Sequence, residues 1–172
     1  RGSRLRPLTK NLPKPMLPVA GRPVMEHIIE QLKKSGIRHV NLTTHFKSEV
    51  IQDYFGDGAH FGVDIAYVEE DQPLGTAGSL RLLQESDDPL LVINGDVLTK
   101  VDFRAMVDFH HEHEAEMTVA VRPYEVTIPY GVVEIEGAII TGIIEKPTLQ
   151  HFINAGIYLL NPEVCRLVPE GE

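Results

Sequence analysis

Short apolar runs of strand length alternate with helix-like segments along the first two thirds of this 172-residue chain. Apolar residues recur at helical spacing from Val24 to Leu32, and Gly36 follows where a helix C-cap belongs. Strands are expected at residues 39–43, 63–68 and 90–93, and helices at residues 48–55, 78–83 and 102–113. This alternation predicts a three-layer, Rossmann-like α/β fold in which helices cover both faces of an open, mostly parallel sheet. The apolar run at 90–93 is typical of a buried strand of the parallel type.

Extended segments replace this alternation in the last third of the chain. The ranges expected to be strands are 117–121, 132–136, 139–145 and 152–160. The two middle ranges favour a hairpin that turns at Glu136-Gly137. With 42% apolar residues, no repeat and no linker, the chain is expected to form one globular domain over residues 1–172.

The charge distribution limits the kinds of partner that the chain can have. A net charge of −9 argues against a nucleic-acid surface, which needs basic residues to neutralise phosphates. No apolar run approaches a membrane span, no secretory signal is visible, and the single cysteine, Cys165, suits a reducing compartment, so a cytoplasmic protein is expected. The basic residues that gather near the N-terminus instead fit a small polyanionic ligand. They are Arg1, Arg4, Arg6, Lys10 and Lys14.

The N-terminal segment has the composition of a loop that binds polyphosphate. Gly2 and Ser3 form a turn in which the backbone can approach an anion, and the Arg4 guanidinium can bind phosphate oxygens. Flanking prolines present Lys14 from a stiff backbone. A solvated basic arm is the alternative interpretation.

A second motif, Asn94-Gly95-Asp96, directly follows the expected strand at 90–93. An acid at the carboxyl end of a buried strand is well placed to hold Mg²⁺, which uses one or two carboxylates together with substrate phosphates. In the alternative interpretation Asp96 only caps the next segment.

A third motif, Leu74-Gly75-Thr76-Ala77-Gly78, opens the expected helix at 78–83. Gly75 lets the main chain contact a flat base, and Thr76 offers a hydroxyl. Just before it, Gln72 could pair with uracil or thymine, whereas the carboxylates at 69–71 could accept hydrogen bonds from guanine. The residues therefore leave the choice of base open.

The last third of the chain holds Tyr130-Gly131-Val132-Val133, Glu145-Lys146-Pro147 and Asn154-Ala155-Gly156. Glu145 can accept hydrogen bonds from sugar hydroxyls, and Lys146 offers a charge for a phosphate, although each alone is also typical of a turn or a surface charge. Earlier in the chain, His110 and His113 lie one helical turn apart and could bind zinc. An exposed polar helix end is the expected alternative there.

Taken in order, these motifs resemble the sugar-1-phosphate nucleotidyltransferases, also called nucleoside-diphosphate-sugar pyrophosphorylases. The subgroup often fused behind a pair of CBS domains and the mannose-1-phosphate guanylyltransferases are the most similar. The resemblance implies the nucleotide-diphospho-sugar transferase fold. It also implies that the family's first strand, which precedes the glycine loop, and a C-terminal part lie outside this sequence.

The resemblance further implies the reaction and its residues. A nucleoside monophosphate would pass from an NTP, with GTP favoured, to a sugar 1-phosphate, giving an NDP-sugar and pyrophosphate with Mg²⁺ as cofactor. The catalytic residues would be Arg4, Lys14 and Asp96, and Asp96 would also be the metal ligand. No segment of this sequence matches the one that carries the family's second acidic ligand. The residues implied to bind the nucleotide are Gly2, Ser3, Arg4, Gln72, Gly75 and Thr76. Those implied to bind the sugar phosphate are Gly131, Glu145, Lys146, Asn154 and Gly156.

Three alternatives to this function remain open from the sequence. The same reaction could use UTP or dTTP. A non-catalytic relative could bind a nucleotide or nucleotide-sugar as a sensor. An ordinary Rossmann-type cofactor protein is the third, although no Gly-x-Gly-x-x-Gly fingerprint is visible. A homo-oligomer and fused regulatory CBS domains are compatible with the resemblance, whereas nucleic acid and membrane partners are not expected.

Overall fold

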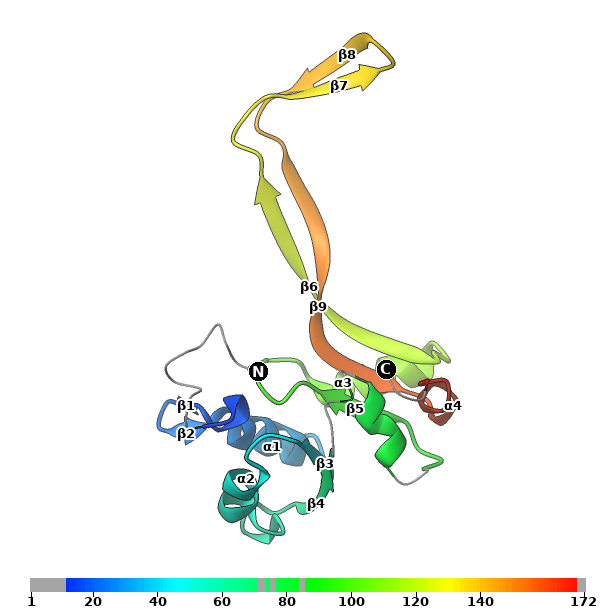
Figure 1. The fold of residues 1–172 in the computed structure, drawn as a ribbon. Helices are drawn as coiled ribbons and strands as arrows, with labels where there is room; N and C mark the ends of the chain where they lie inside the picture. The colour runs from blue at the N-terminus through cyan, green and yellow to red at the C-terminus, as the bar shows by residue number, and fades with distance from the viewer. Residues whose placement is uncertain (1–11, 71–73, 75–76, 84–85, 170–172) are drawn as a thin grey trace. The chain divides into compact units, whose positions relative to one another are not determined.

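The structure is a computed structural model that describes residues 12–70, 74, 77–83 and 86–169. The described residues fall into two compact units (Figure 1). The first unit consists of the residues up to Thr118 together with those from Gly156 onward, and the second is Val119–Ala155. The strands and helices together form a mixed α/β fold, as the alternation in the sequence predicts.

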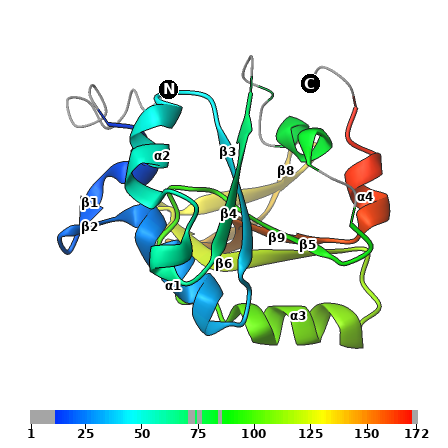
Figure 2. The same ribbon diagram turned by 90° about the horizontal axis from the view of Figure 1, so that it is seen from below.

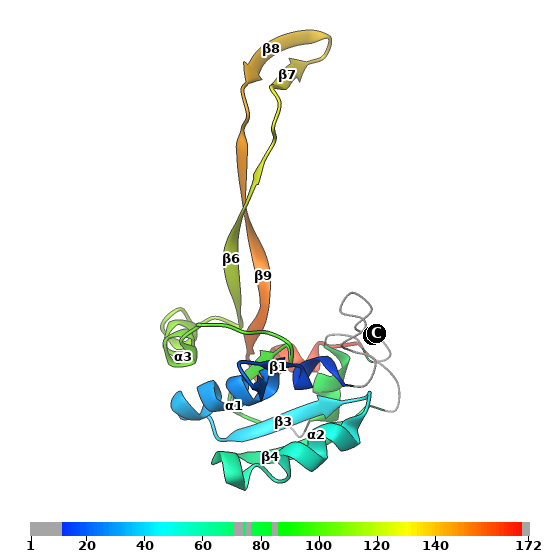
Figure 3. The same cartoon turned by 90° about the vertical axis from the view of Figure 1, so that its left-hand side faces the viewer.

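One part of the first unit is built from helices packed on a pair of parallel strands, shown from two directions in Figures 2 and 3. Its elements are η3 (Lys14–Met16), β1 (Pro18–Val19), β2 (Arg22–Pro23), α1 (Val24–Lys34), β3 (His39–Thr44), α2 (Ser48–Phe55), η4 (Ala59–Phe61) and β4 (Asp64–Glu69). Strand β3 pairs with β4 in register from His39 with Asp64 to Thr44 with Glu69. The expected helices at 24–32 and 48–55 and the expected strands at 39–43 and 63–68 are thus confirmed to within two residues.

The helical spacing in the sequence explains the core of this part. Apolar side chains from α1, α2 and β3 meet in one buried cluster, because residues three and four apart share a helix face. The cluster consists of Met16, Met25, Ile29, Leu42, Ile51, Phe55 and Val63. Helix α1 ends at Lys34, and Gly36 follows its C-cap as predicted, with a φ of +87° that suits glycine and an N–H that donates to the Lys33 carbonyl.

The other part of the first unit is a sheet with strand order β5-β9-β6 together with the helices next to it (Figure 2). Its elements are η5 (Gly78–Leu82), β5 (Leu90–Ile93), α3 (Phe103–Glu112), the inner ends of β6 (Met117–Thr127) and β9 (Thr148–Leu160), and α4 (Pro162–Arg166). Helix α3 begins as predicted, because the Asp102 carboxylate accepts hydrogen bonds from the N–H groups of Arg104 and Ala105 at 3.0 and 3.1 Å.

The strand at 90–93 was predicted to be of the parallel type, and this prediction is wrong for its pairing with β9. Strand β5 pairs antiparallel with β9, from Leu90 with Leu160 to Ile93 with Ile157. A run of four apolar residues indicates a buried strand, but it carries no information about the direction of a partner that follows much later in the chain. Direction is decided by the tertiary path.

The second unit is a ribbon formed by the outer parts of β6 and β9 and by the hairpin of β7 (Val132–Glu136) and β8 (Ile139–Ile144). The expected hairpin with its turn at Gly137 is confirmed, and its register runs from Val132 with Ile144 to Glu136 with Ile139. None of the residues in Val119–Ala155, all of which the structure describes, is buried. No helix among the described residues of the chain is long and apolar enough to cross a membrane.

Candidate functional site

A groove of about 790 Å³ lies in the first unit, along strands β3 and β5. Apolar side chains of β5 and of α1 line its length, including Ile28 and Val92. Polar groups line it as well, and three of them come from the predicted motifs: Lys14, Asn94 and Asp96. Consecutive residues of β3 and of β5 line it, so it lies between the edge strands of two separate sheets.

Lys14 and Asp96 meet in this groove although 82 residues separate them. The Lys14 ammonium donates to the Asp96 carboxylate with an Nζ–Oδ2 distance of 3.2 Å, and the two side chains are 40% and 39% exposed. The backbone around Lys14 is held by Pro13, whose carbonyl accepts from the Met16 N–H at 2.9 Å, as the stiff proline segment predicts. The structure therefore brings together two of the three predicted catalytic residues.

Gly95 is the reason that these two segments can approach each other. A Cβ at this position would lie 3.1 Å from Pro15 Cγ and 3.5 Å from Met25 Cε, which is tighter than ordinary packing in the first case. The turn after β5 thus packs directly against the segment that carries Lys14. Contact between the Asn-Gly-Asp and Lys-Pro motifs is a property of the tertiary structure that neither motif shows alone.

Gly156 reaches the same site from β9. Its φ is +73°, and a Cβ would lie 2.5 Å from Asn94 Nδ2, while its carbonyl accepts from the Asn94 N–H at 2.9 Å. The left-handed backbone favours glycine here, and a side chain would in addition displace the amide group of Asn94. The predicted sugar contact of Gly156 stays a prediction, but the structure adds a packing role. Asn94 itself was not predicted as a site residue, although it stood inside the Asn-Gly-Asp motif.

The groove also contains groups from the region expected to read the base. Glu70 lines the groove, and its carboxylate accepts from the Leu74 N–H at 3.3 Å. Glu69 is engaged elsewhere, because its carboxylate accepts from the Gln52 amide at 2.9 Å. Ser79, which no motif singled out, is buried and lines the groove just after the Gly-Thr-Ala-Gly segment. Six predicted nucleotide contacts lie outside the described residues: Gly2, Ser3, Arg4, Gln72, Gly75 and Thr76.

A second cluster of predicted residues lies in the second unit, at the base of its hairpin. A Cβ on Gly131 would lie 3.1 Å from Glu145 Oε2, and the Lys146 N–H donates to the Tyr130 carbonyl at 3.3 Å. Lys146 has a φ of +47°, and its ammonium lies 4.0 Å from Glu145 Oε1. Glu145 and Lys146 are largely exposed, at 71% and 65% of the side chain. Three of the predicted sugar-phosphate residues are thus neighbours, while Asn154 lies on β9, two residues before Gly156.

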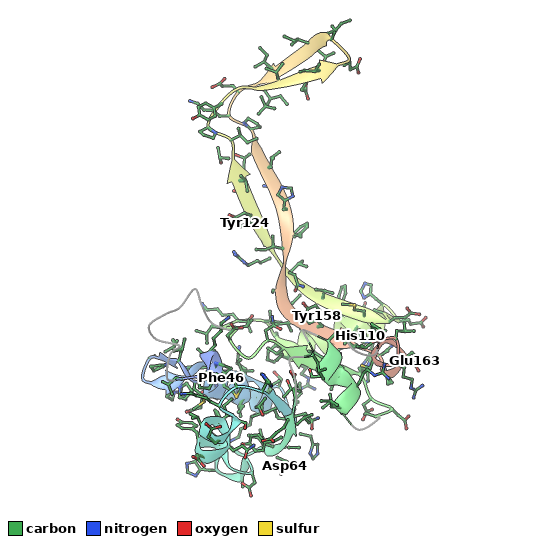
Figure 4. All side chains as sticks on the ribbon, viewed as in Figure 1. Phe46, Asp64, His110, Tyr124, Tyr158 and Glu163 are labelled. Carbon is green, nitrogen blue, oxygen red and sulfur yellow. The ribbon has the colours of Figure 1, made fainter. Side chains whose placement is uncertain are left out.

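His110 is buried, so the expectation of an exposed polar helix end is wrong for this residue. Its side chain is 1% exposed (labelled in Figure 4), and its ring nitrogens lie 2.7 Å from Thr118 Oγ1 and 3.0 Å from Asn161 Oδ1. His113 instead contacts the Phe109 carbonyl at 2.9 Å from the exposed side of α3. Across the described residues, no group of three His, Cys, Asp or Glu side chains could hold a metal, so the zinc hypothesis gains no support.

Comparisons with known proteins agree with this geometry. Residues 1–170 match the family model described as "Nucleotidyl transferase". The chain is 38% identical over 178 residues to a mannose-1-phosphate guanylyltransferase of Mycobacterium tuberculosis, covering 99% of this chain and 49% of that protein. It is 37% identical over 193 residues to a UTP–glucose-1-phosphate uridylyltransferase of Synechocystis, covering 100% and 50%.

A solved structure has a similar fold. The putative glucose-1-phosphate thymidylyltransferase of Bacillus anthracis superposes with a TM-score of 0.77 at 28% identity, covering 99% of this chain and 72% of that one. The chain therefore belongs to the nucleotidyl transferase family and has the nucleotide-diphospho-sugar transferase fold, which confirms the resemblance seen in its motifs. It spans about half the length of the curated relatives it matches. Fusion to CBS domains stays a prediction.

Members of this family generally use a divalent metal ion. Two carboxylates line the groove: that of Glu70, which accepts a hydrogen bond from the Leu74 N–H, and that of Asp96, which is partly exposed. One carboxylate fits a hard cation such as Mg²⁺, which fills its remaining positions with water and with substrate phosphates. Among the residues that the structure describes, the donor set does not fit a metal held by protein ligands alone.

Proposed function

We propose that the protein transfers a nucleoside monophosphate from an NTP to a sugar 1-phosphate, giving an NDP-sugar and pyrophosphate. The observation that carries this proposal is the meeting of Lys14 and Asp96 in the groove, within a chain of the nucleotidyl transferase family. A cation and a carboxylate held together beside an apolar groove match the needs of a metal-bound polyphosphate with an attached base.

The residues would divide the reaction as follows. A phosphate oxygen of the sugar 1-phosphate attacks the α-phosphorus of the NTP, and the bond to the β-phosphate oxygen breaks as pyrophosphate leaves. Lys14 would hold the α-phosphate and Arg4 the departing β- and γ-phosphates. Lys146 would hold the phosphate of the attacking sugar. Positioned charges of this kind supply most of the catalysis in phosphoryl transfer.

Asp96 would hold Mg²⁺, which when bound offsets negative charge on the phosphates. Removing the carboxylate would therefore weaken binding of the metal–nucleotide complex as well as slow turnover. Mg²⁺ is proposed because it favours one or two carboxylates together with water and substrate phosphates, and Asp96 can supply one such carboxylate.

Sugar recognition would involve the residues near the hairpin base and on β9. The Glu145 carboxylate can accept hydrogen bonds from sugar hydroxyls, and Gly131 leaves room next to it, since a Cβ there would crowd Glu145 Oε2. Asn154 can donate and accept through its amide. Gly156 is buried against Asn94, and its sugar contact is proposed from the resemblance to the family alone.

GTP is the proposed nucleotide, with UTP or dTTP as the alternative. The Glu70 carboxylate lines the groove and can accept two donors from a guanine edge, whereas Gln72 would suit a uracil or thymine edge. Three of the relatives compared above act, by their names, on different nucleotides: one is a guanylyltransferase, one a uridylyltransferase and one a putative thymidylyltransferase. The cytoplasm, where NTPs and sugar phosphates are abundant, is the proposed location.

The test is pyrophosphate release with Mg²⁺ across GTP, UTP, dTTP, CTP and ATP against a panel of hexose 1-phosphates. Release that needs both substrates is expected, with GTP preferred. Asp96→Asn and Lys14→Met should each lower the rate by about 10²–10³. Lys34→Met is the matched control, since Lys34 pairs with Glu30 on α1 and does not line the groove. Nucleotide binding without release from any pair would refute the transferase and favour a sensor.

A further inference from the structure

The Lys14–Asp96 ion pair joins the two groups that the proposed function assigns to different ligands. Lys14 is assigned to a phosphate and Asp96 to a metal, yet in the structure each binds the other at 3.2 Å. Lys14 is the only cation within ion-pair distance of Asp96 among the residues that the structure describes. The ammonium therefore lies where a divalent cation would otherwise bind.

We propose that Lys14 is a placeholder on Asp96, which lowers the affinity of the carboxylate for a divalent cation until a nucleotide draws the ammonium away. This inference rests on the proposed function and extends it to the order of events. The metal and the nucleotide would then bind cooperatively, because a phosphate that recruits Lys14 also frees Asp96.

The local structure allows this exchange through side-chain torsions alone. Hydrogen bonds from the Met16 and Leu17 N–H groups to the carbonyls of Pro13 and Lys14 hold the backbone, and the packing of Gly95 on Pro15 holds the opposing turn. Both side chains of the pair are about two fifths exposed, so parting them exposes little that is not already in water. The ammonium can swing on its flexible stem while both backbones stay in place.

The size of the effect follows from the exposure of the pair. An exposed ion pair weakens a competing ligand by about two- to fivefold, since such pairs contribute little in water. The direction of the change in metal affinity is a stronger test of the proposal than its size. Lys14→Met should strengthen binding of a divalent cation in the absence of nucleotide, yet weaken binding of the metal–nucleotide complex. A residue with a merely structural role would weaken both when removed.

The experiment is a Mn²⁺ titration of the nitrogen-15-labelled protein without nucleotide, followed by paramagnetic broadening of the Gly95 and Val97 amide signals. The variants are Lys14→Met, the charge-conserving Lys14→Arg, Asp96→Asn, and Lys34→Met as the control for loss of one positive charge. We expect about two- to fivefold tighter Mn²⁺ binding in Lys14→Met only. Asp96→Asn should lose the broadening, and melting temperatures check that each variant folds.

The possible results separate the two proposals. If Lys14→Met binds Mn²⁺ no more tightly than the wild type while Asp96→Asn loses binding, the proposed competition between Lys14 and the metal is refuted. The assignment of Asp96 as a metal ligand is then supported. If Asp96→Asn binds Mn²⁺ as the wild type does, the metal role of Asp96 in the proposed function is refuted together with the placeholder. Tighter binding in Lys34→Met as well would refute the specific role of Lys14.

Discussion

Replacing Gly156 by alanine tests whether this glycine is needed for packing next to the groove. The new Cβ would lie 2.5 Å from Asn94 Nδ2, and the residue has a φ of +73°. The left-handed backbone costs an alanine about 1–2 kcal/mol. The Asn94 side chain is exposed, so turning it aside adds about 0.5–1 kcal/mol, and the change strains the 2.9 Å hydrogen bond between the Asn94 N–H and the Gly156 carbonyl. We expect a loss of about 2–3 kcal/mol in the free energy of unfolding.

Gly36→Ala separates the two causes of that loss. Gly36 has a φ of +87°, but a Cβ there meets nothing within 4 Å, so only the backbone cost of about 1–2 kcal/mol should appear. The measurement is urea-induced unfolding of both variants and the wild type, analysed with a common slope. Equal losses for Gly156→Ala and Gly36→Ala would refute the packing argument. A Gly156→Ala variant of normal stability that only raises the KM for the sugar would assign the residue to substrate contact alone.

Two further predictions concern the stability of the first unit. His110→Ala should lower the free energy of unfolding by about 2–4 kcal/mol, because it leaves a cavity and removes the ring nitrogen next to the Asn161 amide oxygen; an unchanged denaturation midpoint would contradict this. Hydrogen bonds from Lys34 and then Arg22 lower the pKa of Glu30 from its ordinary value of 4.5. The stability that the Glu30 carboxylate contributes is therefore present above pH 4.5 and is lost as the pH falls through the lower pKa of the folded state. Glu30→Gln should make the free energy of unfolding less dependent on pH in this acid range. An unchanged dependence on pH would contradict the stabilising role of Glu30.

Local sequence patterns were enough to predict most helices and the hairpin. Helix α2 occupies residues 48–55 as the apolar spacing predicts, and α3 begins at the Asp102 cap. The hairpin turns where Glu136-Gly137 indicates. These features depend on residues a few positions apart, whose preferences act wherever the segment lies.

Features that depend on distant partners were missed or wrong. The antiparallel partner of β5 is one such feature, because pairing is set by where β9 returns. The short β1–β2 pair, which turns through Ala20 and Gly21 at positive φ, was not predicted because each strand has only two residues. Helical spacing places His110 on the same face of α3 as Phe103 and Met106, but its hydrogen-bond partners on β6 and just after β9 were not predicted because they come from other parts of the chain.

For the candidate site, the sequence by itself determined which chemical groups are present and the family to which the chain belongs. The order of the glycine loop, Lys-Pro, Asn-Gly-Asp and Glu-Lys-Pro motifs is a property of the chain alone. Only the tertiary structure decided that Lys14 binds Asp96 and that Gly156 packs on Asn94. Such contacts require segments far apart in the chain to approach within a few ångströms, and that approach depends on how the whole core packs.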